Sequence, residues 1–365
     1  MSTRCVKVHH PGGAYDVVVG FDLTGACVKA LDKLTPQPSS LIVVTDSNVA
    51  RHASKAVDRL LASKFERTNA LSVIPAGERS KSLATFGKLH DRCLAHSPDR
   101  DAAIVALGGG VVGDVAGFLA ATLLRGVRIV HIPTSLLAMV DSAIGGKTAI
   151  NHARGKNLIG AFHHPAAVFA DLAMLGTLPE REYVNALGEV VKYGVVLNAP
   201  LFAFIERNAQ ALLARDATIV QRVVLSCVRN KAQVVSRDPH EKAERIVLNY
   251  GHTVGHAIEK VSGYRVAHGE AVAIGMVAAA RIGERAGVTP PATCERQEAL
   301  LVSLGLPVRL PKRMSVPAIV AALAGDKKRR GGALRFILPG RIGTWTTWET
   351  KDTKPIAACL REMQP

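Results

Sequence analysis

Three histidines stand close together in the second half of the chain, and their spacing could hold a metal ion. The stretch LNYGHTVGHAIE contains His252 and His256, and His268 and Glu270 follow shortly after it. Because His252 and His256 are four residues apart, a helix places both on one face, about one turn apart. A single histidine would more simply be hydrogen-bonded in a core. Three histidines beside glycines favour a divalent metal site, for which zinc is the default ion.

Length and composition indicate an ordinary globular protein with room for two domains. The chain has 365 residues, of which 48% are hydrophobic and 21% charged. Its six cysteines are scattered without a CxxC pair, so we expect no disulfide framework and a cytoplasmic location. The N-terminus has no signal-peptide pattern, and glycines and Asp114 interrupt the longest apolar stretch. We therefore expect no membrane span.

The net charge of +16 is the unusual bulk property. Nucleic-acid binding is an obvious explanation, but the basic residues are spread along the chain and aromatic residues make up only 4%. The densest basic run, at residues 327–330, is short enough to be a solvated loop. We expect no nucleic-acid partner. The charge instead favours attraction of small anions, such as phosphate or carboxylate substrates.

Strands and helices alternate in the first half of the chain. Short apolar runs predict strands over residues 40–45, 71–74, 102–107 and 126–133, and helical patterns occupy 50–64 and 82–96. This alternation predicts an α/β nucleotide-binding domain with a parallel sheet over residues 1–174. Longer helical patterns at 182–196, 201–235 and 253–286 predict a mainly helical domain over 175–365.

A glycine-rich turn follows the third strand of this pattern. Gly108, Gly110 and Gly113 match G-x-G-x-x-G between a strand and a helix, where backbone amides can hold a pyrophosphate. The match is weak alone, because such turns also occur for packing and this one is not on the first strand. The polar pair Asp46 and Asn48 ends an earlier strand, where it could bind ribose hydroxyls or form an Asx turn. Together these features favour a dinucleotide.

A second glycine-rich segment, DSAIGGKTAIN followed by GKN, superficially resembles a phosphate-binding loop but lacks the G-x-x-x-x-G-K spacing. Lys147, Lys156 and Asn157 could bind a small phosphate or the nicotinamide end of a cofactor, or they could belong to a solvated loop. Farther on, Glu189 and Lys192 lie three apart on an apolar helix. They could form a structural ion pair, or supply a carboxylate ligand and a lysine directed at substrate.

In combination and order, these blocks resemble the 3-dehydroquinate synthase family of sugar-phosphate cyclases. The resemblance covers nearly the whole chain and rests on GGGVVGDVAGFLAATLLRG, DSAIGGKTAIN, GKNLIGAF, GEVVK, LNYGHTVGHAIE and HGEAVAIGM. It implies an NAD-binding α/β domain, a helical metal-binding domain and a homodimer. It also implies conversion of a phosphorylated sugar acid, 3-deoxy-D-arabino-heptulosonate 7-phosphate, to 3-dehydroquinate and phosphate in the shikimate pathway of aromatic amino-acid biosynthesis.

The resemblance implies a role for particular residues of this chain. Zn²⁺ or Co²⁺ would be bound by Glu189, His252 and His268, with His256 catalytic and Glu270 not a ligand. Arg125 would reach a phosphate across the dimer interface. The substrate residues implied are Asp141, Lys147, Lys156, Asn157, Lys192, Lys231, Arg245, Asn249 and one of Lys327 and Lys328. The NAD contacts implied are Asp46, Asn48, Glu78, Lys81, Gly110, Gly113 and Asp114, and we add Lys147 and Lys156 to this group.

The implied chemistry is a transient oxidation of a substrate hydroxyl by NAD⁺, elimination of phosphate, return of the hydride and an intramolecular aldol closure, with no net redox change. Two alternatives stay open. One is a sister cyclase, acting on an amino-substituted sugar phosphate or on sedoheptulose 7-phosphate. It is suggested by unusual residues before Glu189 and before Arg245, although Lys231, Arg245 and Asn249 argue against a non-carboxylated substrate. The other is a metal-dependent NAD polyol dehydrogenase, which the lysine cluster disfavours.

Overall fold

The chain divides into two compact units, which the computed structural model describes over residues 2–65, 67, 69–327 and 332–365. The first unit comprises residues 1–179 and 224–240, and the second comprises 180–223 and 241–365. One boundary lies inside helix α8 (Ala217–Arg237), so this helix contributes residues to both units. The division after residue 174 that the sequence suggests stays a prediction.

The first unit is built on a seven-stranded sheet in the order β1-β2-β9-β6-β5-β3-β4. All neighbouring strands are parallel except β1 and β2, which form an antiparallel hairpin at one edge. The α/β expectation is thus confirmed. The strands are β1 (Arg4–His10), β2 (Gly13–Gly20), β3 (Leu41–Asp46), β4 (Ala70–Ile74), β5 (Ala103–Gly108), β6 (Arg128–Pro133) and β9 (Ala167–Asp171).

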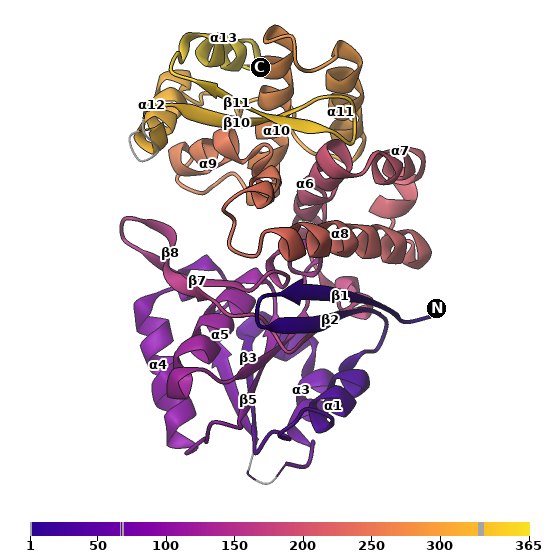
Figure 1. The fold of residues 1–365 in the computed structure, drawn as a ribbon, viewed down its shortest axis with the longest axis vertical. Coiled ribbons are helices and arrows are strands. Elements are labelled where there is room, and N and C mark those ends of the chain that lie inside the picture. The colour runs from indigo at the N-terminus through magenta and orange to yellow at the C-terminus, as the bar shows by residue number, and fades with distance from the viewer. Residues whose placement is uncertain (1, 66, 68, 328–331) are drawn as a thin grey trace. The chain divides into compact units, whose positions relative to one another are not determined.

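Helices cover both faces of this sheet, as Figure 1 shows. Alternate residues of β3 enter different cores: Ile42 and Val44 pack with α5, whereas Leu41 and Val43 pack with α1 and α3. This double burial explains why the central strands are continuous apolar runs. The helical segments are α1 (Thr24–Asp32), α2 (Ser47–His52), α3 (Ser54–Leu61), η1 (Glu78–Ser80), α4 (Leu83–Ala95), α5 (Gly110–Thr122), η2 (Leu123–Arg125), η3 (Ala138–Ser142) and η4 (Leu172–Thr177).

The later part of the second glycine-rich segment is more regular than a loop. Residues Lys147–His152 form β7 and Gly155–Phe162 form β8, and the two strands pair as an antiparallel hairpin. Ile150 and Ile159 attach this hairpin to the core beside α5. A hairpin therefore presents Lys147 and Lys156, in place of the flexible loop that the glycines suggested.

The second unit is mainly helical, as expected. Its elements are α6 (Glu180–Leu197), α7 (Ala199–Leu213), the first residues of α8, η5 (Glu244–Asn249), α9 (His252–Val261), α10 (His268–Arg285), α11 (Pro291–Ser303), α12 (Val316–Lys327), β10 (Leu334–Pro339), β11 (Trp345–Thr350) and α13 (Lys354–Glu362). The antiparallel pair of β10 and β11 was not predicted from the sequence. Helix α10 is buried along most of its length and forms the centre of this unit.

Three of the predicted helices were wrong in length, because each is two helices. The pattern at 50–64 divides between α2 and α3 at Ala53, and the pattern at 201–235 divides between α7 and α8. There Arg215 has φ 58°, and Asp216 accepts hydrogen bonds from two amides that open α8. The pattern at 253–286 breaks at Gly263 and Tyr264, both with φ 61°. His268 consequently begins a new helix.

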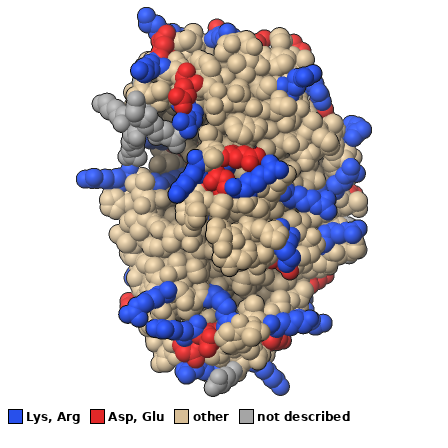
Figure 2. Space-filling model, viewed as in Figure 1, with Lys and Arg blue, Asp and Glu red and all other residues tan. Residues whose placement is uncertain are grey.

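Basic side chains are scattered over the face shown in Figure 2, with acidic side chains between them, and do not form one basic field there. This distribution agrees with the even spread of lysine and arginine along the sequence. Within the described ranges, no helix is long and apolar enough to cross a membrane.

Burial of His131 on β6 predicts an acid-sensitive first unit. Burial, with a smaller contribution from the charge of His163, lowers the pKa of His131 to about 4. In the unfolded chain, His131 would take up a proton near pH 6.5. Above that pH it costs the folded protein nothing, and as the pH falls from 6.5 toward 4 it lowers the free energy of unfolding. The loss should reach about 3 kcal/mol. Urea unfolding at pH 7 and pH 4 should show a smaller loss for His131→Gln than for the unchanged protein. Equal losses would contradict the prediction.

Candidate metal centre and cofactor turn

Close contacts between helix backbones bring Glu189 on α6 to the start of α10. A Cβ atom at Gly188 would lie 2.6 Å from the carbonyl oxygen of Gly269, and one at Gly269 would lie 1.7 Å from the carbonyl oxygen of Asn185. Only glycine permits this approach, because any side chain would overlap backbone atoms. The approach places a buried carboxylate next to His268, the first residue of α10.

A second close approach brings α9 against α10. Gly251 caps α9 with φ 79°, and a Cβ atom at Gly275 would lie 2.0 Å from the Gly251 carbonyl oxygen. His252 is the first residue of α9, so its side chain, like that of His268, lies at the beginning of a helix, here one that packs against α10. The glycines near the histidines in the sequence therefore serve to bring helices together.

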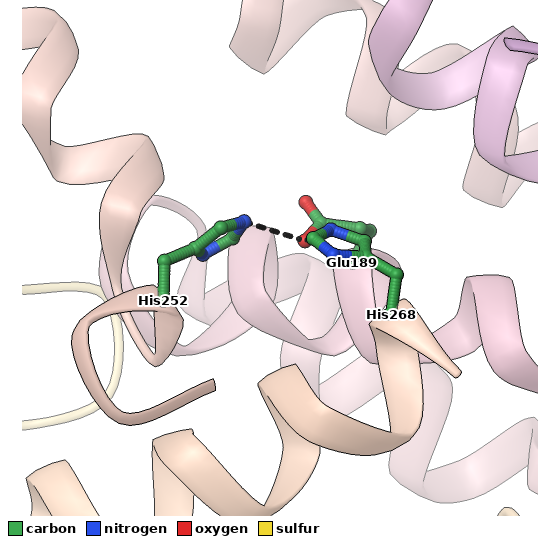
Figure 3. Close-up of side chains that lie close together, drawn as sticks. All are labelled: Glu189, His252 and His268. Atoms are coloured by element: carbon green, nitrogen blue, oxygen red, sulfur yellow. Dashed lines mark ion pairs between the residues drawn. The ribbon is translucent and has the colours of Figure 1, made fainter. Parts of the chain in front are cut away.

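Glu189, His252 and His268 converge as a possible metal-binding group, which Figure 3 shows. The Nε2 atoms of His252 and His268 lie 3.3 Å and 3.6 Å from Glu189 Oε1. Ligand atoms bound about 2.0–2.1 Å from a tetrahedral zinc ion would be separated by roughly 3.3–3.4 Å. The three donors thus fit one zinc ion or a similar divalent ion, and leave a fourth position for substrate.

Hydrogen bonds indicate which nitrogen of each ring faces the ion. Nδ1 of His252 lies 3.0 Å from the carbonyl oxygen of Tyr250, and Nδ1 of His268 lies 3.4 Å from Glu259 Oε2. A carbonyl or carboxylate oxygen can only accept, so each Nδ1 carries a hydrogen. In the neutral form of each ring, Nε2 then has the lone pair that a metal ion would use.

Without a metal ion, the two rings differ in protonation. Burial lowers the pKa of His252 to about 3, with Glu189 opposing this effect and Lys192 adding to it. Burial also lowers the pKa of His268, but hydrogen bonds to Glu189 and Glu259 and their negative charges outweigh it, and raise the pKa to about 10. A metal ion would therefore displace a proton from His268 when it binds.

Lys192 completes the surroundings of Glu189. Its ammonium group pairs with Glu189 Oε2, the carboxylate oxygen other than the one that faces the histidines, and both side chains are buried. The structural ion pair and the ligand role that the sequence suggested are thus compatible, because Oε2 of Glu189 pairs with Lys192 and Oε1 faces the histidines.

His256 and Glu270 lie beside this group with different surroundings. The ring of His256 is exposed, and its centroid lies 5.2 Å from that of His252. The histidine that joins His252 and Glu189 in the possible metal-binding group is nevertheless His268. The i,i+4 pair that the spacing favours is thus not the pair that converges on Glu189. Glu270 accepts a hydrogen bond from the Ala267 amide at 3.0 Å and pairs with Arg181, so it caps α10.

In the first unit, the glycine-rich turn leads from β5 into α5. A Cβ atom at Gly108 would overlap Val112 at 2.5 Å, so this glycine is needed for packing. Gly110 opens α5, and a Cβ atom there would lie 3.1 Å from Ser142 Oγ. Amides of the first helical turn have no partner within a helix and favour anions. The turn therefore fits a pyrophosphate, for packing and electrostatic reasons together.

Polar residues from three segments meet near α5. Lys81 pairs with Asp114 at 2.6 Å and also donates to Asn157 Oδ1, and Asn151 donates to Glu78 Oε1 at 2.7 Å. Burial raises the pKa of Asp114, although Lys81 acts against the increase. The structure thus brings together four of the implied cofactor and substrate residues, namely Glu78, Lys81, Asp114 and Asn157.

Asp46 caps α2, with its Oδ1 accepting from the amides of Asn48 at 2.8 Å and Val49 at 3.0 Å. The Asx turn, one of the two interpretations of this pair, is therefore present. Elsewhere in the first unit, Lys231 pairs with Asp141 at 2.6 Å. Arg125 is exposed, with φ 71°, at the end of η2.

The second unit also contains Arg245, whose side chain is fully buried on η5, and Asn249, which donates to Glu241 Oε1 at 3.3 Å. Sequence analysis missed Glu241, which lies in a loop, and Glu259. The latter could have been found, because it continues the helix face of His252 and His256 by one turn. The proposed contact of Lys327 or Lys328 concerns side chains outside the described residues.

The fold, an α/β unit with a mainly helical unit, is that of a class of enzymes solved with NAD⁺ and a metal ion. A 2-epi-5-epi-valiolone synthase from Streptomyces hygroscopicus, solved with NAD⁺ and Zn²⁺, is 28% identical with a TM-score of 0.86, over 96% of both chains. A 2-deoxy-scyllo-inosose synthase, solved with carbaglucose-6-phosphate, NAD⁺ and Co²⁺, is 27% identical with a TM-score of 0.88, over 99% of this chain and all of the other. A probable glycerol dehydrogenase from Sinorhizobium meliloti, 18% identical over 95% of both chains with a TM-score of 0.63, shares the fold.

Sequence comparison places the chain within this class. The profile of the 3-dehydroquinate synthase N-terminal domain matches residues 71–185, and that of the C-terminal domain matches 186–329. A 3-dehydroquinate synthase from Desulforamulus reducens is 46% identical over 90% of this chain and 92% of its own. One from Nostoc punctiforme is 42% identical over 99% and 100%. The chain belongs to the 3-dehydroquinate synthase family.

Proposed function

We propose that this protein converts 3-deoxy-D-arabino-heptulosonate 7-phosphate to 3-dehydroquinate and phosphate, using NAD⁺ catalytically with a divalent metal ion. The observation that carries the proposal is the convergence of Glu189, His252 and His268 within a chain of this family. Identity of 42–53% to 3-dehydroquinate synthases, against 27–28% to the two other cyclases, supports this branch over its sisters. The dehydrogenases share the fold alone.

The metal ion would supply a Lewis acid that acidifies a substrate hydroxyl, and NAD⁺ would accept and return a hydride. Glu189, His252 and His268 would hold the ion, and Lys192 keeps Glu189 in place through its second oxygen. The turn at Gly110 would hold the pyrophosphate of NAD⁺. His256, whose ring is exposed and is not one of the three residues that would hold the ion, would exchange protons with substrate.

The remaining implied residues would bind a substrate that carries phosphate and carboxylate groups. Lys147 and Lys156 lie on the β7–β8 hairpin and would offer positive charge to phosphate. Asp141 fixes the ammonium group of Lys231, so this lysine is already oriented. Asn249 and the buried Arg245 would orient the carboxylate end of the substrate.

A phosphate-release assay tests the proposal. Purified protein with the heptulosonate phosphate, NAD⁺ and Zn²⁺ should release one phosphate per 3-dehydroquinate formed, without accumulation of NADH. Omission of the metal ion should abolish the release. Stoichiometric NADH formation from a polyol, without phosphate release, would instead support a dehydrogenase.

We also propose a cytoplasmic homodimer in which Arg125 completes the phosphate site of the partner. Its exposure at the end of η2 supports this role, because an exposed guanidinium is available to another subunit. Arg125→Ala and His256→Ala homodimers should both be nearly inactive. A mixed dimer should regain one working site of two, since one subunit keeps His256 and receives Arg125 from the other. Verified mixed dimers without activity would contradict this arrangement.

A further inference from the structure

The ring of His268 lies between two buried carboxylates from different helices. Its Nε2 atom is 3.6 Å from Glu189 Oε1 on α6, and its Nδ1 atom is 3.4 Å from Glu259 Oε2 on α9. Glu259 is 6% exposed and follows His252 by seven residues on the same helix face. Only Glu189 belongs to the expected ligand set, which leaves the purpose of the second carboxylate to be explained.

We propose that Glu259 is a positioning residue that orients His268 and fixes its tautomer for metal binding. This inference rests on the metal site of the proposed function. An ionised carboxylate accepts the hydrogen of Nδ1, so the neutral ring that binds a metal ion has its lone pair on Nε2, the atom that faces Glu189. A carboxylate behind a metal-binding imidazole also makes the ring a stronger electron donor.

The other histidine has a neutral counterpart of this arrangement. Nδ1 of His252 is held by the carbonyl oxygen of Tyr250, which fixes the tautomer without adding a formal charge. Glu259 adds a negative charge in addition to a hydrogen-bond acceptor. Glu189 and Glu259 thus place two negative charges beside His268, against one positive charge on Lys192, and this charge favours a cation bound by the ring.

A competing explanation is that Glu259 binds a second cation. His256, Glu259 and His268 also form a group whose possible ligand atoms lie close together. The two explanations differ in stoichiometry. A second site would add a metal equivalent that depends on Glu259, whereas a positioning residue changes the affinity for the first equivalent only.

The test is zinc affinity, measured by competition with a chromophoric chelator on metal-depleted protein. Glu259→Gln keeps the shape and an acceptor but loses the charge, and should weaken zinc binding about 10-fold, and Glu259→Ala about 100-fold. The absorption bands of the Co²⁺-loaded protein should shift as well. Glu298→Gln is the matched control, because Glu298 pairs with Arg281 of α10 at 2.8 Å, away from the metal group, and should leave zinc affinity unchanged.

A double-mutant cycle separates positioning from a general structural role. If Glu259 acts through His268, then Glu259→Gln should cost little further zinc affinity in a His268→Ala background. The isosteric Gln variant carries the test if the Ala variant fails to fold. Unchanged zinc affinity in folded Glu259→Gln, additive losses in the cycle, or loss of a second zinc equivalent would each overturn the inference. Absence of zinc binding by the unchanged protein would instead overturn the proposed function.

Discussion

Replacing His268 with alanine is expected to remove most of the zinc affinity and turnover while the fold survives. The ring would supply one of the three donors of the proposed site, and its Nε2 atom faces Glu189 Oε1. If the binding free energy of a zinc site is shared among its ligands, one ligand accounts for roughly 3–5 kcal/mol, or about 150-fold to 5,000-fold in affinity. Zinc content after dialysis and phosphate release measure the two effects, and circular dichroism checks the fold.

His256→Ala is the matched control for this experiment, because His256 lies on the same helix as His252 but does not group with Glu189. It should keep stoichiometric zinc and still lose turnover, since its proposed role is proton exchange. The opposite pattern, with zinc kept by His268→Ala and lost from His256→Ala, would restore the pair of histidines that the i,i+4 spacing favours.

The parallel sheet could be predicted from the sequence because each central strand has its own signal within a few consecutive residues. Strand β5 is a run of apolar residues that ends in glycines, and this pattern predicts a doubly buried strand that leads into a turn. The edge hairpin of β1 and β2 was not predicted, because β1 is largely exposed and rich in basic residues, so it lacks the apolar run that marks the central strands. Pairing between distant segments, such as that of β2 with β9, has no local signature.

The metal group was predicted only in part for the same reason. The spacing of His252 and His256 is a local pattern, and it favours a pair that differs from the two histidines that lie beside Glu189. That His268 begins a separate helix depends on the left-handed residues Gly263 and Tyr264. That Glu189 meets it depends on the close approach at Gly188, a tertiary contact. The expected ligand set came from the family resemblance, and it stays a prediction.

The second large effect should be a preference, in kcat/KM, for the carboxylated heptulosonate phosphate over sedoheptulose 7-phosphate. Arg245 is fully buried, and a desolvated guanidinium interacts strongly with an anionic partner. Sedoheptulose 7-phosphate carries a hydroxymethyl group where the heptulosonate carries its carboxylate. Loss of this charge-assisted contact should cost on the order of 2–5 kcal/mol, or roughly 30-fold to a few thousand-fold in kcat/KM. Competing the two sugar phosphates at equal concentration measures the ratio.

Arg245→Ala should lower the ratio of the two kcat/KM values, mainly by decreasing kcat/KM for the carboxylated substrate. We expect a smaller change from Lys231→Ala, because Asp141 already pairs with the Lys231 ammonium group, so less of its charge is available to substrate. Arg281→Ala is the control, since Arg281 pairs with Glu298 and should leave the ratio unchanged. If the unchanged protein converts sedoheptulose 7-phosphate as fast as the carboxylated sugar, the buried guanidinium does not recognise a carboxylate. The chain would then act as one of the sister cyclases.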